Sequence, residues 1–254
     1  MRRTGLLALL MAGFSFAQPL AEPAHLWDKM YYIWLFISVV IYLVVFIPGA
    51  YFLIKYRYRK GVNEEAQHVK ESPALEVLWT IIPVIIVIYL ATQSFAFYKT
   101  QRTAPADSFE IKVTAFMWGW QFEYPNGKQV ILFFNMYEDP ETNSILPLDK
   151  IPDTAKAYIP AGVPIKALLT SQDVIHSFFV QPAKVTEDMV PGRITQMWFK
   201  INQPGEYWVF CREYCGTKHS KMVAVLKVVP KEEFEEWYGQ PIDSANKVSL
   251  NKNF

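Results

Sequence analysis

The chain has 254 residues, of which 52% are hydrophobic and 16% aromatic, a rich share for an ordinary soluble domain. Lys and Arg number 25 against 24 Asp and Glu, so the formal net charge is +1. This balance excludes the broadly basic surface that phosphates call for, and no nucleic-acid partner is expected. Part of the apolar excess is expected to lie in membrane lipid.

The first residues, MRRTGLLALLMAGFSFAQ, have the layout of a secretory signal. Two arginines precede a short apolar run, and Ser15 and Ala17 form a small-x-small site. We therefore predict that residues 1–17 are a signal peptide, cleaved after Ala17. The alternative is a short membrane helix, but the apolar run is shorter than the ~20 residues that a span requires.

Two long uncharged runs predict a transmembrane hairpin within residues 18–98. The first span, 30–54, exceeds the ~30 Å of a bilayer core at ~1.5 Å per residue. The second span, 77–98, has Trp79 and Tyr98 at its ends, where interfacial aromatic residues are common. The alternative is two buried helices of a soluble core, which would need helices apolar on all sides in a chain this short.

The loop between the spans, residues 55–76, begins with KYRYRK. Positive charge beside a span favours the cytoplasmic side, so both chain ends are expected outside. The signal peptide indicates the same orientation, and the two features together suit the plasma (inner) membrane of a bacterium. The hairpin then delivers everything after Lys99 to the extracytoplasmic side.

The outer segment, 99–230, is rich in β-branched and aromatic runs separated by Pro, Gly, Asn and Asp. The runs are VTAFMWGWQFEY, YIPAGVPIKALLTS, VIHSFFV, RITQMWFKI, YWVF and MVAVLKVV. This spacing predicts an all-β sandwich or barrel. The stretch 126–156 is expected to form strands and a surface loop. The last segment, 231–254, begins with KEEFEEWYG and is predicted as a C-terminal helix with a polar tail.

One short stretch, CREYCGTKHSKM, holds both cysteines, a histidine and a methionine. Cys211, Cys215, His219 and Met222 follow one another at offsets of four, four and three. Soft sulfur ligands with imidazole favour copper. A mononuclear blue site would use one cysteine. Two thiolates four residues apart can instead bridge two copper ions, which then share the electron hole between them.

Each copper of such a pair would need a histidine, and this loop supplies only His219. His25 and His68 lie in the wrong segments, which leaves His176 in QDVIHSFFV. A structural disulfide is an alternative outside the cell, but it would leave both histidines and Met222 unexplained. Zinc is a further alternative, although methionine is a poor zinc ligand.

The pattern C-x-E-x-C-x-x-x-H-x-x-M after a two-helix hairpin resembles subunit II of cytochrome c oxidase with its binuclear CuA centre. LEVLWTIIP, WGWQFEY, QDVIHSFFV and VPGR also occur in the family's order. The resemblance implies a cupredoxin-like barrel in an electron-input subunit. It would take electrons from cytochrome c and pass them to haem in the catalytic subunit I of a haem-copper oxidase. Oxygen reduction and the coupled proton translocation would occur there, and no haem is expected in this chain.

The resemblance implies a set of copper ligands: His176, Cys211, Glu213, Cys215, His219 and Met222. The two cysteines would bridge both coppers, and His176 with Met222 would complete one of them. His219 and the backbone carbonyl of Glu213 would complete the other. The Glu213 carboxylate would point to a Mg²⁺ shared with subunit I, which suits a hard cation; read alone, it would be a solvated loop acid.

Two tryptophans match the family's aromatic patch. Trp118 occupies the place of the residue that accepts the electron from cytochrome c, with Trp120 behind it as a supporting aromatic. Read alone, alternate tryptophans on a strand are more often core residues. The sequence departs from the family's W-Y-W at Gly119 and has Met117 where glutamine is common, so the docking surface is expected to suit an unusual donor.

Two acidic residues also match the family. Glu76, at the start of the second span, aligns with the glutamate at the mouth of the K proton pathway; read alone, it only favours the helix dipole. Asp173 matches an acid implicated in docking a basic cytochrome; read alone, it is a turn aspartate.

Other functions fit parts of the pattern, among them a disulfide-stabilised adhesion or sensor domain, which is the least favoured. A quinol oxidase subunit of the same fold is disfavoured because such relatives lack the copper ligands. A CuA-bearing nitric oxide reductase subunit stays open, because its electron acceptor would lie in another chain. A membrane-tethered copper-binding or storage protein would tolerate an incomplete ligand set. The sequence has no C-x-x-C-H motif, so the donor would be a separate carrier.

Overall fold

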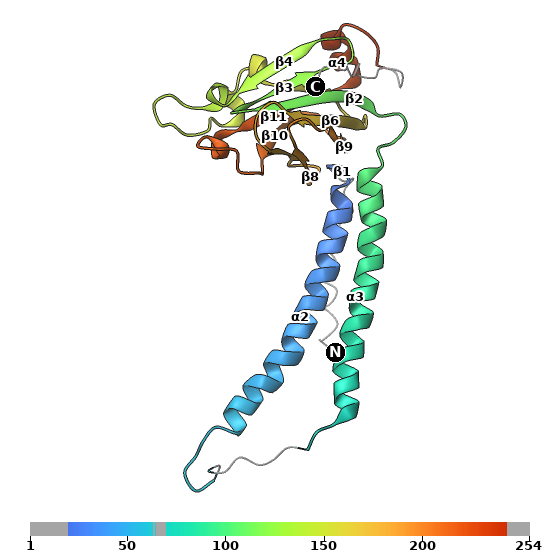
Figure 1. Cartoon of the computed structure of the whole chain (residues 1–254). Helices are drawn as coiled ribbons and strands as arrows, with labels where there is room; N and C mark the ends of the chain where they lie inside the picture. Colours follow the sequence, from blue (N-terminus) through green and yellow to red (C-terminus); the bar gives the residue numbers. More distant parts are fainter. Residues whose placement is uncertain (1–19, 63, 65–69, 243–254) are drawn as a thin grey trace, which may run out of the picture. The chain divides into compact units, whose positions relative to one another are not determined.

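The structure is a computed structural model that describes residues 20–62, 64 and 70–242. It divides into two compact units (Figure 1): a helical unit, residues 26–100, and a β unit formed by the residues before and after it. The predicted signal peptide, His68 and the end of the polar tail lie outside the described residues.

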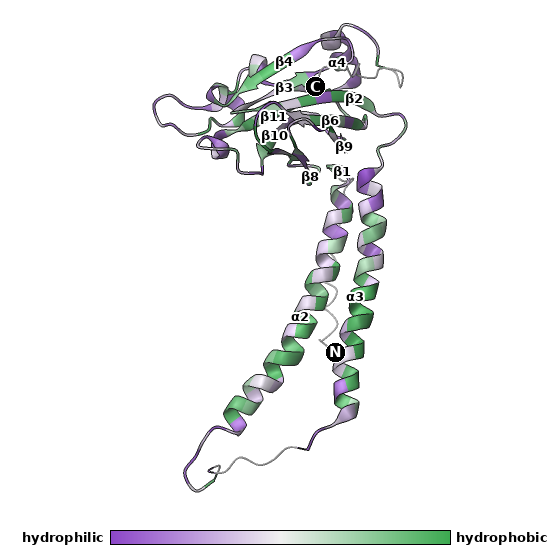
Figure 2. Ribbon diagram, in the orientation of Figure 1, coloured by the Kyte–Doolittle hydropathy of each residue, from purple (hydrophilic) through white to green (hydrophobic). Residues whose placement is uncertain are grey.

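The helical unit contains helix α2 (Ala24–Lys55) and helix α3 (Pro73–Arg102). Both are long and apolar enough to cross a membrane, and Figure 2 shows hydrophobic residues along most of each helix. Their side chains are mostly exposed in the isolated chain. Because helices of a soluble core bury an apolar face, this exposure fits helices surrounded by lipid.

The β unit has two sheets. The six-stranded sheet runs in the order β1 (Ala21–Glu22), β9 (Thr195–Ile201), β6 (Ile165–Ser171), β2 (Phe109–Phe116), β3 (Gly119–Glu123), β4 (Gln129–Phe133). The five-stranded sheet runs in the order β5 (Ala157–Pro160), β11 (Val223–Val229), β10 (Gly205–Cys211), β7 (His176–Val180), β8 (Val185–Met189).

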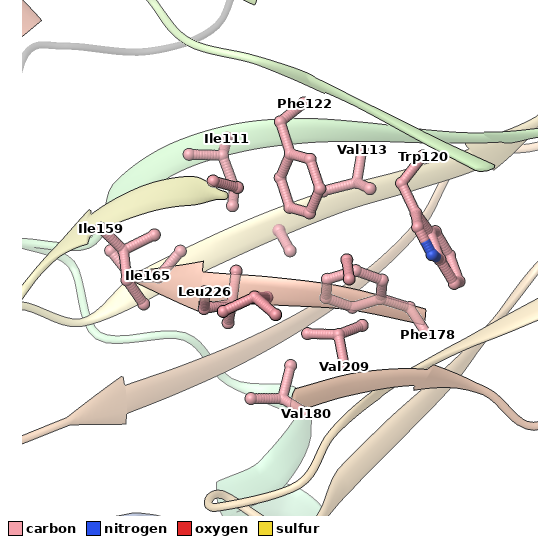
Figure 3. Close-up of a cluster of buried hydrophobic side chains, with 14 of the residues drawn as sticks. Ile111, Val113, Trp120, Phe122, Ile159, Ile165, Phe178, Val180, Val209 and Leu226 are labelled. Carbon is pink, nitrogen blue, oxygen red and sulfur yellow. The ribbon is translucent and has the colours of Figure 1, made fainter. Parts of the chain in front are cut away.

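Alternation along the strands places the core between the two sheets, because successive strand residues point to opposite faces. Val113, Trp120 and Phe122 come from the six-stranded sheet, and Phe178 and Leu226 come from the other (Figure 3). All five are fully buried. The architecture confirms the predicted fold class, a helical hairpin followed by a cupredoxin-like all-β domain.

The run VTAFMWGWQFEY forms two strands instead of one. β2 ends at Phe116 and β3 begins at Gly119, so Met117 and Trp118 make the turn between antiparallel partners. A Cβ at Gly119 would lie 2.5 Å from the backbone oxygen of Leu132 and 2.7 Å from the Phe116 ring. The close approach explains why glycine stands there.

The run YIPAGVPIKALLTS also divides, into β5 and β6 of different sheets. The stretch 126–156 forms β4 followed by three short 3₁₀ helices: η1 (Phe134–Tyr137), η2 (Leu148–Lys150) and η3 (Asp153–Ala155). A fourth, η4 (His219–Lys221), lies just before β11.

The C-terminal helix is α4 (Lys231–Tyr238). It packs on the β unit through Phe234 and Tyr238, whose rings lie 5.6 and 5.5 Å from that of Phe109. The helix ends at Gly239, which has a φ of 89° and donates its N–H to the Glu235 carbonyl, a left-handed cap that favours glycine.

Candidate metal centre

Strand pairing brings the histidine strand beside the ligand loop. His176 begins β7, Cys211 ends β10, and the two strands pair with Cys211 opposite Phe178. The loop then returns through η4 into β11, which pairs with β10 on its other side. The Cys211 N–H donates to the Met222 carbonyl at 3.1 Å, which closes the loop at its base.

The side-chain donor atoms converge in the closed loop. The Sγ atoms of Cys211 and Cys215 are 3.7 Å apart. His176 Nδ1 lies 3.9 Å from Cys211 Sγ and 3.1 Å from Met222 Sδ. His219 Nδ1 lies 3.6 Å from Cys215 Sγ. The loop and β7 therefore assemble the two thiols, two imidazoles and one thioether that the sequence singled out.

The two cysteines are free. A disulfide would bring the sulfurs to about 2.05 Å, well inside the distance found. Burial first, and then the neighbouring Cys211, raise the pKa of the Cys215 thiol to about 12. A bound cation reverses this preference because it stabilises thiolate. Sulfur with imidazole suits copper, and the buried thioether argues against zinc.

The backbone of Glu213 also faces the site. Its carbonyl oxygen lies 3.2 Å from Cys211 Sγ, while the residue as a whole is exposed. The carbonyl can therefore act as a ligand while the carboxylate remains free to interact outside the loop.

Asp173 holds the ring of His176. Its Oδ1 lies 2.9 Å from His176 Nε2, and it accepts the N–H groups of Val174 at 2.7 Å and Met117 at 2.6 Å. Partial burial opposes ionisation, but these donors outweigh it and lower the pKa of Asp173. An ionised acceptor at Nε2 leaves Nδ1 free to face the sulfurs. Sequence reasoning missed this contact, whose only signal was the three-residue spacing.

Trp118 lies directly against the ligand loop. Its Nε1–H donates to the Cys215 carbonyl at 3.1 Å. A Cβ at Gly216 would lie 3.1 Å from the Trp118 ring, and the φ of 117° there favours glycine. The indole is partly exposed and packs edge-on against Phe134 at 6.1 Å.

Trp120 is fully buried behind the site. Its ring is 5.2 Å from that of Phe178 and 6.5 Å from that of His176. Its Nε1 has no hydrogen-bond partner among the residues that the structure describes. Glu76 lies in the other unit, exposed in the first turn of α3.

Comparisons with known proteins agree along the chain. The family described as cytochrome c oxidase subunit II, periplasmic domain, matches residues 109–229, and the transmembrane domain of the same subunit matches residues 13–97. A protein of Rickettsia bellii named "Probable cytochrome c oxidase subunit 2" is 30% identical, over 92% of this chain and 84% of its own length. Cytochrome c oxidase subunit 2 of Candida albicans is 31% identical, over 93% and 88%.

Among solved structures, the periplasmic domain of subunit II of cytochrome oxidase of Bradyrhizobium japonicum is 26% identical. It covers 54% of this chain and 95% of its own, with a TM-score of 0.46.

Proposed function

This chain belongs to the cytochrome c oxidase subunit II family, and from that premise we propose that its donor cluster holds a binuclear CuA centre reduced by cytochrome c. The chain is the electron-input subunit of an oxidoreductase complex, in which oxygen reduction belongs to another subunit. The family match does not favour the nitric oxide reductase or storage alternatives.

One observation carries the proposal: two thiols, two imidazoles and a thioether converge at one place. Cys211 and Cys215 would each reach both coppers. His176 with Met222 would complete one copper, and His219 with the Glu213 carbonyl the other. When bound, such a pair supplies a one-electron store whose charge is shared over two ions.

The protein groups around the cluster have separate tasks. Trp118 presents a partly exposed ring to the donor and hydrogen-bonds the Cys215 carbonyl, which supports its role in accepting the electron. Trp120 is fully buried behind His176, with its ring 6.5 Å from the imidazole, which supports its role as a supporting aromatic. Asp173 orients the His176 ring, and we assign it this task ahead of donor docking because its carboxylate is engaged internally.

Two further acidic residues, Glu213 and Glu76, are proposed to bind a cation and to take up protons. The exposed Glu213 side chain is proposed to reach a Mg²⁺ shared with subunit I. Glu76, in the first turn of α3, is proposed to take up protons at the cytoplasmic mouth of the K pathway.

The chain is a membrane protein, with a matched transmembrane domain and two helices of spanning length. We propose that it spans a bacterial plasma membrane with the β unit outside. The basic residues after α2 support this orientation, because positive charge is retained on the cytoplasmic side.

The test is the copper content and electron paramagnetic resonance spectrum of the purified oxidase containing this chain. We expect a multi-line mixed-valence signal that disappears in Cys215→Ser. A single-ion copper spectrum from this chain, or a mixed-valence signal that survives the substitution, would exclude the binuclear centre.

A further inference from the structure

Lys221 stands between two proposed copper ligands, His219 and Met222, but points away from the metal centre. Its Nζ contacts the Glu138 carboxylate, the backbone oxygen of Asn143 at 2.9 Å and the side-chain oxygen of Asn143. The Lys221 and Glu138 side chains are only 18% and 15% exposed. An ammonium has three N–H donors, and here three oxygens surround it.

The segment that Lys221 contacts, residues 138–146, is held by hydrogen bonds within its own turn. The Asp139 N–H donates to the Ser144 carbonyl and the Asn143 N–H to the Asp139 carbonyl, both at 2.8 Å. The Asp139 carboxylate accepts further N–H groups from the same turn. Asn143 has a left-handed φ of 55°, a conformation that asparagine tolerates. The turn therefore presents both Asn143 oxygens to one point.

The segment is tied to the core at its base. The Leu146 N–H donates to the Tyr137 carbonyl at 2.8 Å, and Tyr137 is fully buried with its hydroxyl donating to the Ala155 carbonyl at 2.7 Å. Because the segment is anchored in this way, a residue that binds it, such as Lys221, is also held against the core of the β unit.

The ligand turn has little support of its own. η4 is three residues long and has no side-chain cap. Its internal bonds are those from the Lys221 N–H to the Lys218 carbonyl and from the Met222 N–H to the His219 carbonyl. Lys218 rests over the Phe134 ring at 5.3 Å. Among the described residues, Lys221 is the member of η4 that ties the turn to a charged partner outside the ligand loop.

We propose that Lys221 is a positioning residue: with Glu138 and Asn143 it forms a clamp that holds His219 and Met222 at the spacing the copper centre requires. The inference rests on the proposed function. Outer contacts of this kind orient the ligands they support, and their loss typically weakens metal binding by about 10–100-fold. An exposed ion pair would not do this, but here removal of Lys221 takes away the cation paired with Glu138, whose side chain is only 15% exposed.

The experiment measures loss of the copper signal from the purified oxidase in the presence of a copper chelator. Lys221→Met is expected to release copper about tenfold faster than wild type. The matched control is Lys227→Met on β11, which breaks the Lys227–Asp153 pair of 2.7 Å. The Asp153 side chain is 59% exposed, so this variant is expected to retain copper like wild type. Lys221→Arg, which keeps the charge, is expected to recover part of the retention.

Coupling within the clamp is tested with Glu138→Gln. If Lys221 acts through Glu138, the double variant releases copper no faster than Lys221→Met alone, because residues in one network are not additive. The clamp variants are also expected to broaden the paramagnetic spectrum, because the copper ligands are held less uniformly. A substitution that only lowers the stability of the fold would not broaden it.

Equal copper retention in wild type and Lys221→Met, or equal losses in Lys221→Met and Lys227→Met, would overturn the clamp. His219→Ala separates this outcome from failure of the proposed function. If His219→Ala loses the signal while Lys221→Met keeps it, only the clamp is wrong. If His219→Ala keeps the signal, the ligand assignment is wrong, and the clamp proposal, which depends on that assignment, is wrong as well.

Discussion

At the scale of single residues, the site depends on contacts made by groups that do not themselves face the cluster. Asp173 fixes the His176 ring, Gly216 leaves room for an indole, and Trp118 spans from the surface to the Cys215 carbonyl. Ligand identity can be read from a motif. Ligand orientation is set by these outer contacts.

Trp118→Phe tests the indole as the electron acceptor. The substitution keeps an aromatic ring but removes the Nε1–H donated to the Cys215 carbonyl at 3.1 Å. We expect the copper spectrum to be retained and reduction by cytochrome c to slow by about tenfold, or 1.4 kcal/mol of barrier. Stopped-flow mixing measures the rate; an unchanged rate would move electron acceptance to another residue.

Gly216→Ala tests the fit between the ligand loop and Trp118. The φ of 117° and the 3.1 Å approach to the indole both disfavour a side chain. Backbone strain of this kind costs on the order of 1–3 kcal/mol. We expect a lower thermal midpoint and an altered copper spectrum. If both stay as in wild type, the loop can accommodate a side chain at position 216 without strain.

At the scale of elements, ion pairs and α4 join segments that are distant in the chain. Asp153 of η3 lies 2.7 Å from Lys227 of β11, which is 74 positions away in the chain. It also lies 3.2 Å from its near neighbour Lys156. α4 covers the end of the core beside Phe109. The Asp153 ion pairs and the packing of α4 therefore stabilise the β unit away from the ligand loop.

Asp153 predicts a pH dependence of stability. A hydrogen bond from Lys227 is the largest effect and lowers the pKa of Asp153. Burial opposes it, while a hydrogen bond from Lys156 and the charges of both lysines add to the lowering. A lowered pKa stabilises the fold above the unfolded value of about 3.9, and that stability is lost as pH falls through the folded pKa. Because the side chain is 59% exposed, the effect is expected to be small.

The measurement is urea unfolding of wild type and Asp153→Asn at neutral pH and at pH near 3. The difference between them is expected to shrink at the lower pH. A difference that stays constant would show that the lysines do not act through the Asp153 charge.

Phe234→Ala tests the packing of α4. The ring is fully buried between α4 and the sheet, and truncation of a buried phenylalanine typically costs about 3–5 kcal/mol. Glu236→Ala, at an exposed position of the same helix, is expected to change stability by no more than about 0.5 kcal/mol. Chemical denaturation compares the two; equal effects would mean that α4 is not part of the core.

At the scale of the whole molecule, the β unit is completed by residues that precede the first membrane helix. β1 pairs with β9, Ala21 is fully buried, and Glu22 lies 2.7 Å from Lys200. The Asn202 N–H donates to the Leu20 carbonyl at 3.0 Å. One sheet therefore joins a segment that precedes the first membrane helix to strands that follow the second.

A fragment beginning at Gln101 tests this arrangement. It lacks β1, so the β9 edge is open to water. We expect hydrogen exchange of the Asn202 amide to be faster in the fragment than in the whole chain, because exchange follows local opening. Amides of the central strand β2 serve as the internal control. Equal protection of Asn202 in both would show that β1 is dispensable.

The sequence by itself determined the features that are local. The apolar runs of α2 and α3 and the spacing of Cys211, Cys215, His219 and Met222 could be read directly, because each depends on residues close together in the chain. The turn at Met117 and Trp118 could not be read from the sequence, because the residues on both sides of it have strand composition. The close approach of Gly119 to the Leu132 backbone exists only in the folded sheet.

His176 could be singled out from the sequence by elimination, but only the tertiary structure decided how it and other distant residues meet. Pairing of β7 with β10 brings His176 to the cysteines, and Lys221 reaches Glu138 across 83 positions of sequence. β1 joins β9 although a membrane hairpin separates them. Such contacts follow from sheet order and register, which local composition does not encode, since the same strands could pair in many orders.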